Sequence, residues 1–248
     1  MMDVIQDVAL AVQFMTRVPI RSLRLDPARL SRAAAWFPAV GLFVGGLAAL
    51  VYMLVVPHLA RTLAALIAVL VMVMITGGLH EDALADSADA FGGGWTREDK
   101  LRIMKDSRIG SFGAIALILS LASRVLLLAT MPAGAVIGYL VSAQVLARCT
   151  PLPLGALLRP AREQEGQGRR LAGTMSWFTV ALGATIAIVL TALILRASAW
   201  QPILAVAMVT GVSALYYARR LGGITGDCMG ATIQISEIAV YLCGAWIR

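Results

Sequence analysis

The sequence predicts an all-α fold, a polytopic integral membrane helix bundle with seven or eight transmembrane segments. Of its 248 residues, 59% are hydrophobic and only 14% are charged, whereas about a quarter of the residues in soluble proteins are charged. The mean hydropathy is +0.82. A helix that crosses the hydrocarbon core needs roughly 20 predominantly apolar residues, and segments of that kind recur along the chain. A water-soluble fold could not bury so much apolar surface.

The apolar segments divide the chain into successive spans. Seven have the length and composition of a span, at residues 36–56, 62–79, 111–131, 133–150, 175–195, 200–217 and 231–247. An eighth candidate, at 4–19, is shorter and contains Asp7, Gln13 and Arg17, so an interfacial or re-entrant helix is an equal alternative. The connections are short, and we expect residues 1–248 to form one membrane domain. The N-terminus lacks the features of a cleaved signal peptide, so its first apolar segment should stay in the mature protein.

Basic residues are concentrated in every second connection. They number five in residues 17–32, five in 97–108, four in 159–170 and two at Arg219 and Arg220. The connections between these hold at most one each, which is the pattern of the positive-inside rule. We therefore expect the loops at 17–32, 81–110, 159–173 and 219–230 to face the cytoplasm. Membrane topology also explains the net charge of +7 without a nucleic-acid partner.

The segment GGLHEDALADSADAFGGG, residues 77–94, carries the strongest chemical signal. Asp82, Asp86 and Asp89 stand at i, i+4 and i+7, which places three carboxylates on one helix face. No Lys or Arg occurs between Arg61 and Arg97. At roughly 6 Å and an effective dielectric near 20, each adjacent pair would repel by about 2 to 3 kcal/mol. The alternatives are a solvated acidic face with surface salt bridges and a divalent-cation site, for which oxygen ligands favour Mg²⁺ or Mn²⁺.

A basic cluster follows these acids, and it ends in the turn KDSR at residues 105–108, beside the next span. Carboxylates followed by cations suit a metal-bound diphosphate, in which the acids hold metal and Lys or Arg binds the remaining phosphate charge. The alternative, that the cations only set topology, is preferred for Arg97, Lys100 and Arg102. His80, two residues before Asp82, either contacts substrate or has a structural or capping role.

Several segments together resemble the cobalamin synthase family, also called adenosylcobinamide-GDP ribazoletransferase. The family signature runs close to GGxHxDGLADTxDG followed by IMxDSRxGxxG, and this chain has GGLHEDALADSADA and IMKDSRIGSFG. The segments FMTRVP, FPAVGLFVGG, AREQEGQG and GGITGDCMGA are similar to further family segments in order and spacing. The chain departs at Ala83 and Ala90, where the family usually has Gly. These departures concern close backbone approach and leave the carboxylates unchanged.

The resemblance implies the final assembly of the nucleotide loop of cobamides. Adenosylcobinamide-GDP would be the donor, and a hydroxyl of α-ribazole or its 5′-phosphate would attack the phosphorus nearer cobinamide. GMP would leave, and adenosylcobalamin or its 5′-phosphate would form. Asp82, Asp86 and Asp89 match the acidic motif and are the expected catalytic ligands of Mg²⁺, with Mn²⁺ as the alternative. The other residues carried over are the supporting acids Asp106 and Asp227 and the substrate contacts His80, Lys105, Arg108 and Asp227.

The same resemblance implies a multi-pass protein of the bacterial inner membrane, with membrane lipid around it and the active site facing the cytoplasm. A homo-oligomer is compatible with the sequence. Arg124, Arg148 and Glu237 lie within predicted spans, where charges are costly. They either line a substrate cavity or have a structural role, as an Arg–Glu pair between helices or, for Arg148 near its helix end, by snorkelling.

Two other functional classes also fit an acidic membrane helix. The first is a divalent cation transporter, because acids at a membrane helix end also bind ions in transit. The expected place of the acids, at the cytoplasmic edge of the membrane and not at its midplane, argues against this class. The second is a CDP-alcohol phosphotransferase that acts on lipids. Its motif has an Arg in the stretch DGxxAR, where this chain has Asp86.

Overall fold

A computed structural model of the chain describes residues 2–20, 29–162 and 171–246. Within these ranges the chain is helical and has no β-strand, and an isolated bridge pairs Pro160 with Ile224. The helices, in chain order, are α1 (Met2–Met15), α2 (Leu30–Ala33), η2 (Ala34–Trp36), α3 (Phe37–Val55), α4 (Arg61–Thr76), α5 (Leu79–Gly93), α6 (Arg97–Ile103), α7 (Ser111–Thr130), α8 (Ala133–Ala147), α9 (Pro151–Leu157), α10 (Trp177–Leu195), η4 (Arg196–Ser198), α11 (Trp200–Leu221) and α12 (Gly226–Trp246).

The helices have the lengths that a multi-pass membrane protein requires. Among the described residues, six helical segments are long and apolar enough to cross a bilayer, and the bent pair α4 and α5 would make a seventh. The predicted helix-bundle fold is therefore confirmed. The upper count of seven spans in the structure equals the lower of the two predicted numbers. Helix α1 has 14 residues and is not among these segments, so the eighth candidate is not supported as a span. The predicted span at 133–150 continues through α9 to Leu157.

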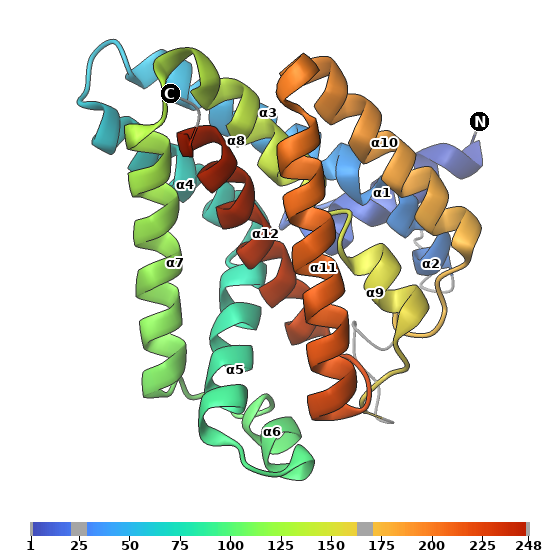
Figure 1. Ribbon diagram of the computed structural model, residues 1–248. Coiled ribbons are helices and arrows are strands. Elements are labelled where there is room, and N and C mark those ends of the chain that lie inside the picture. Colours follow the sequence, from blue (N-terminus) through green and yellow to red (C-terminus); the bar gives the residue numbers. More distant parts are fainter. Residues whose placement is uncertain (1, 21–28, 163–170, 247–248) are drawn as a thin grey trace.

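The connections fall at two opposite ends of the bundle. In Figure 1, α6 and the turn between α11 and α12 lie at the lower end, while the α7–α8 and α10–α11 connections lie at the upper end. Helices α7 and α11 run between these ends and flank α5 and α12. The basic connections predicted to be cytoplasmic at 97–108 and 219–230 therefore share one end, as the charge alternation requires.

Small residues bring the helices into close contact. A Cβ atom on Gly41 of α3 would lie 2.2 Å from the carbonyl oxygen of Gln144 in α8, so this packing requires glycine. A Cβ on Gly230 of α12 would lie 2.4 Å from the Cβ of Ala83 in α5. Close backbone approach through small residues is the usual way that membrane helices associate. The methyl group of Ala83 is accommodated because its partner across the contact is a glycine.

Two glycines break the predicted span at 62–79. Gly77 and Gly78 have φ angles of 68° and 72°, a left-handed conformation that side chains other than glycine rarely adopt. The amide N–H groups of Gly77 and Gly78 donate to the carbonyls of Met74 and Val73, which closes the end of α4. Helix α5 then leaves at 89° to α4. The predicted span at 62–79 is therefore helical as far as Thr76. Its last residues are not part of that helix, because apolar composition does not report the backbone conformation of a Gly-Gly pair.

Candidate active site

The acidic helix α5 runs alongside α7, and its C-terminal part lies beside the first residues of α7. Asp89, near the C-terminal end of α5, bonds to the backbone of Gly110 and Gly113, where α7 begins. Glu81, in the first turn of α5, bonds to Arg124 of α7. From Gly113 to Arg124 is 11 residues, or about 16 Å along a helix axis. Glu81 therefore lies deeper in the bundle than Asp89, because the break at Gly77 and Gly78 starts α5 away from the end at which α7 begins. The position of the acids relative to the membrane edge stays a prediction.

Three carboxylates and one guanidinium group form the centre of the candidate site. Asp86 lies within electrostatic range of Asp82 and Asp227 and of the guanidinium group of Arg162. A guanidinium nitrogen of Arg162 lies 3.8 Å from Oδ2 of Asp227. Asp82 is exposed, and Asp86 and Asp227 are half-buried. The sequence GGxxxD occurs twice, at 77–82 and 222–227, and the structure brings the two Asp residues into one cluster. In both segments the first glycine is left-handed and ends the preceding helix.

Asp89 has a different environment from the other two acids of its motif. Its side chain is buried, with Oδ2 2.7 Å from the backbone nitrogen of Gly110 and Oδ1 2.8 Å from that of Gly113. Both N–H groups belong to the start of α7, whose first amides have no partner within the helix. Asp89 therefore caps α7 and fixes it against α5. The prediction that it is also a metal ligand stays a prediction.

The turn between α6 and α7 holds a preformed ion pair. The guanidinium group of Arg108 donates to both carboxylate oxygens of Asp106, at 3.0 and 2.7 Å. The hydrogen bonds from the Arg108 side chain lower the pKa of Asp106 to about 2. The Arg108 side chain is 86% exposed, and Lys105 is also exposed. This turn presents positive charge at the end of the bundle where the predicted cytoplasmic loops lie, and the predicted phosphate contacts stay predictions.

A buried ion network lies beneath the acidic face. The guanidinium group of Arg124 donates to Glu81 at 2.8 Å and to Glu237 at 3.3 Å, and Arg148 lies 3.7 Å from Glu237. Gln234 donates to the same oxygen of Glu81 at 3.1 Å. Of the alternatives for these intramembrane charges, the structure has the Arg–Glu pair between helices. Arg148 does not snorkel, because it is buried beside Glu237. The network ties the first turn of α5 to α7 and α12, and so positions the neighbouring Asp82.

His80 lies on the other side of α5 from Asp82. Its side chain is 3% exposed, and its Nε2 has no hydrogen-bond partner among the described residues. The N-cap of α5 is Gly78, with no side-chain hydrogen bond. His80 therefore does not cap the helix and does not join the carboxylate cluster.

Sequence reasoning missed two residues of this site. Glu81 was passed over because the i, i+4, i+7 spacing selects Asp82, Asp86 and Asp89 and leaves Glu81 off their face. Arg162 belongs to the segment at 161–168 that resembles the family, but the pattern gave it no role. The remainder of that segment lies outside the described residues. The family-like segments themselves were the signal that could have directed attention to Arg162.

Comparison with known proteins decides the family. The family model described as cobalamin-5-phosphate synthase matches residues 7–245 of this chain. The chain belongs to the cobalamin-5-phosphate synthase family. A relative named adenosylcobinamide-GDP ribazoletransferase from Shewanella amazonensis is 39% identical over 94% of this chain and 92% of its own length. Relatives of the same name from Polaromonas sp. and Ralstonia pickettii are each 38% identical, over 96% and 93% of this chain. No solved structure matches the chain.

Membership of the cobalamin-5-phosphate synthase family makes this protein an enzyme, a transferase of cobalamin biosynthesis with several membrane-spanning helices. The family match argues against the transporter and the CDP-alcohol phosphotransferase. The assignment therefore rests on similarity along nearly the whole chain and not on depth in the membrane.

The carboxylate cluster supplies only part of the ligands that a magnesium ion requires. In the described parts of the chain, no three His, Cys, Asp or Glu side chains are grouped as a ready metal site. Mg²⁺ is usually held by one or two carboxylates together with water and substrate phosphates, and not by a complete protein cage. Asp82 and Asp86 offer carboxylates that no described cation contacts within salt-bridge distance. This donor set fits a metal that arrives with a diphosphate.

Proposed function

We propose that this chain transfers the phosphocobinamide group of adenosylcobinamide-GDP to α-ribazole or α-ribazole 5′-phosphate, with release of GMP. The relatives are named for a ribazole transfer from this donor. The single observation that carries the proposal is the cluster of Asp82, Asp86 and Asp227, which among the described residues faces one guanidinium group, that of Arg162. Carboxylates without balancing cations suit a substrate that brings phosphates and a divalent metal.

In the proposed reaction, the acceptor hydroxyl oxygen forms a bond to the phosphorus nearer cobinamide. The bond from that phosphorus to the bridging oxygen breaks, and the bridging oxygen leaves with GMP. The hydroxyl proton passes to a carboxylate of the cluster. Asp89 is not suited to accept it, because both oxygens of Asp89 already accept backbone hydrogen bonds.

Asp82 and Asp86 would hold Mg²⁺ or Mn²⁺. The metal, when bound, would neutralise charge on the two phosphates. Arg162 is placed to bind a phosphate oxygen, because it already lies beside the cluster and its guanidinium group also donates to the Leu101 carbonyl at 3.1 Å. Arg108 and Lys105 offer further positive charge toward the nucleotide. We place the site on the cytoplasmic side of a bacterial inner membrane, from the distribution of Lys and Arg.

The proposal is tested with the purified protein in proteoliposomes, supplied with adenosylcobinamide-GDP, Mg²⁺ and each acceptor. We expect GMP and a cobamide product in equal amounts. Asp82→Asn and Asp86→Asn should each lower turnover by about a hundredfold or more, while the protein still inserts and folds. Glu98→Gln is the matched control, because Glu98 is a 78% exposed acid on α6. Near-normal turnover in both Asp variants would exclude the proposed metal site.

The stereochemistry of the transfer separates one displacement from two. A direct in-line attack inverts the configuration at the cobinamide-side phosphorus, whereas a covalent phospho-enzyme would give retention. A chirally labelled phosphorothioate donor should show inversion. Retention, or a trapped phosphorylated side chain, would exclude direct transfer.

A further inference from the structure

An apolar groove lies on the face of α5 that points away from the acids. It has a volume of about 610 Å³ and runs between α5, α11 and α12. Leu84 and Ala88 of α5 line it together with Val212 of α11 and Ile235 of α12. At 3.6 residues per turn, Leu84 and Ala88 are each rotated by about 160° from Asp86 around the helix. The groove is therefore separate from the candidate active site, with α5 as the wall between them.

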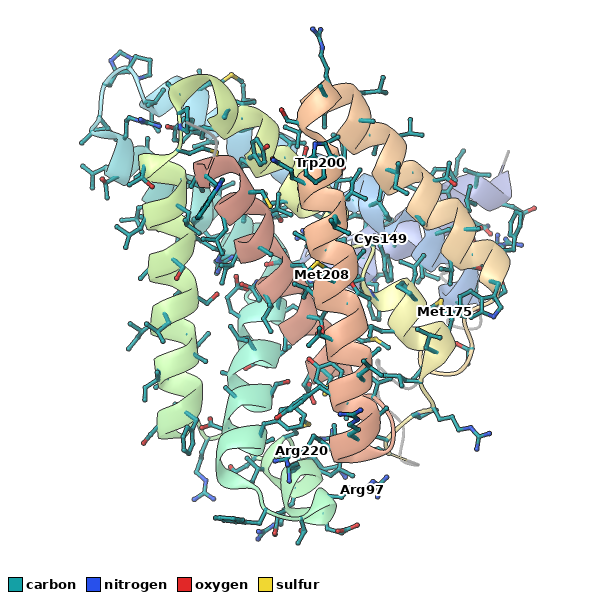
Figure 2. All side chains as sticks on the ribbon, viewed as in Figure 1. Arg97, Cys149, Met175, Trp200, Met208 and Arg220 are labelled. Atoms are coloured by element: carbon teal, nitrogen blue, oxygen red, sulfur yellow. The ribbon has the colours of Figure 1, made fainter. Side chains whose placement is uncertain are left out.

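The groove is open toward the surroundings of the bundle. Met208 and Val212, which line it, are 61% and 67% exposed. Helices α11 and α12 are both long and apolar enough to span a membrane, so the medium at this opening is lipid and not water. Figure 2 shows Met208 near the middle of α11 and Arg220 near the lower end of the same helix. The volume lies within the range of roughly 300 to 1,000 Å³ that is usual for ligand sites.

A basic and aromatic group stands where the groove reaches the end of α11. Tyr216 lines the groove, and the guanidinium carbon of Arg220 lies 6.0 Å from the centre of its ring. In the part of the chain that the structure describes, no carboxylate lies within salt-bridge distance of Arg219 or Arg220. Positive charge here is also expected from topology alone. Topology does not explain why the guanidinium group of Arg220 lies beside Tyr216, at the end of an apolar groove.

We propose that this groove binds one acyl chain of an anionic phospholipid, and that the lipid phosphate pairs with Arg220. Apolar side chains along the groove match the hydrocarbon chain, and a guanidinium group at its cytoplasmic end matches the phosphate. Basic sites between membrane helices on the cytoplasmic side are typical places for anionic headgroups. The site does not depend on the transfer reaction, because α5 separates it from the carboxylates.

The test measures lipid retained by the purified protein. Delipidated protein in detergent receives phosphatidylglycerol or phosphatidylcholine, and native mass spectrometry counts bound lipid. Val212→Trp places an indole in the groove, and Leu193→Trp, on a 71% exposed residue of α10 outside the groove, is its matched control. Val212→Trp should retain about fivefold less phosphatidylglycerol than Leu193→Trp. Arg220→Gln should lower phosphatidylglycerol affinity by about fivefold, and Arg196→Gln, at the opposite end of the bundle, should leave it unchanged.

Three results would overturn the proposal. The first is equal lipid retention by Val212→Trp and Leu193→Trp, which would mean that lipid covers the bundle without a specific groove. The second is a loss of phosphatidylglycerol affinity that is the same for Arg220→Gln and Arg196→Gln, which would reflect net charge only. Both Trp variants replace side chains that already face lipid, so misfolding does not obscure the comparison. A stable dimer of the chain in place of a lipid adduct would assign the groove to a second copy and would also overturn the proposal.

Discussion

Arg124 joins three helices through a buried ion network, and its removal should destabilise the protein. The side chain of Arg124 is 1% exposed, and its guanidinium group lies 2.8 Å from Glu81 and 3.3 Å from Glu237. In Arg124→Gln, Glu237 keeps the longer contact with Arg148, at 3.7 Å, and a hydrogen bond with the neutral side chain of Gln144. Glu81 keeps only the amide of Gln234. One negative charge is then left without a compensating cation in the interior.

The magnitude follows from this burial. Breaking a buried pair by removing one partner costs about 3 to 5 kcal/mol, because the remaining charge is neither solvated nor paired. Removal of an exposed pair costs about 1 kcal/mol or less. Arg102, in an exposed pair with Asp99 at 2.8 Å, has a side chain that is 78% exposed. Arg124→Gln should therefore lower the free energy of unfolding by about 3 kcal/mol more than Arg102→Gln does.

The assay is reversible unfolding in mixed detergent micelles, followed by circular dichroism, for both single variants. A double variant, Arg124→Gln with Glu81→Gln, removes one charge of each sign and leaves the contact between Arg148 and Glu237. It should regain most of the lost stability, since charge balance in the network is restored. The reasoning is refuted if Arg124→Gln costs no more than Arg102→Gln, or if the double variant is less stable than Arg124→Gln alone.

Three further predictions concern separate parts of the fold. Asp86→Asn should keep or raise the melting temperature, because it relieves repulsion between Asp86 and the neighbouring carboxylates. Asp89→Asn should lower the free energy of unfolding by about 1 to 3 kcal/mol, since an amide cannot accept both backbone N–H groups. Equal melting temperatures of the two variants would contradict this. Cysteine at Gly93 should react with an impermeant reagent only from the cytoplasm, and cysteine at His58 only from outside; the reverse would overturn the topology. The pKa of Asp106 is lowered to about 2. Its contribution to stability is therefore complete above about pH 4 and is lost as the pH falls through about 2. Asp106→Asn should not alter the pH dependence of the melting temperature between about pH 5 and 8.

The composition of the sequence and the local spacing of its residues determined the fold class, the reaction class and part of the candidate site. The apolar segments predicted a helical membrane bundle. A segment that crosses the bilayer must satisfy its own backbone hydrogen bonds, so it forms a helix, and its long run of apolar residues is visible in the sequence. The acidic motif on α5 and the segments similar to the family predicted a transferase of cobalamin biosynthesis. The charges at Arg124 and Glu237 were also recognised as unusual from their place within predicted spans.

Only the tertiary structure decided what each of these residues does. Asp82, Asp86 and Asp89 look equivalent along the helix, but Asp89 caps α7 while Asp86 lies near Asp227. The partners of Arg124 are 43 and 113 residues away in the chain. Helical periodicity reports which residues share a face, but not which distant helix covers that face. The depth of the acids likewise depended on the left-handed glycines at 77 and 78, whose bend places α5 inside the bundle.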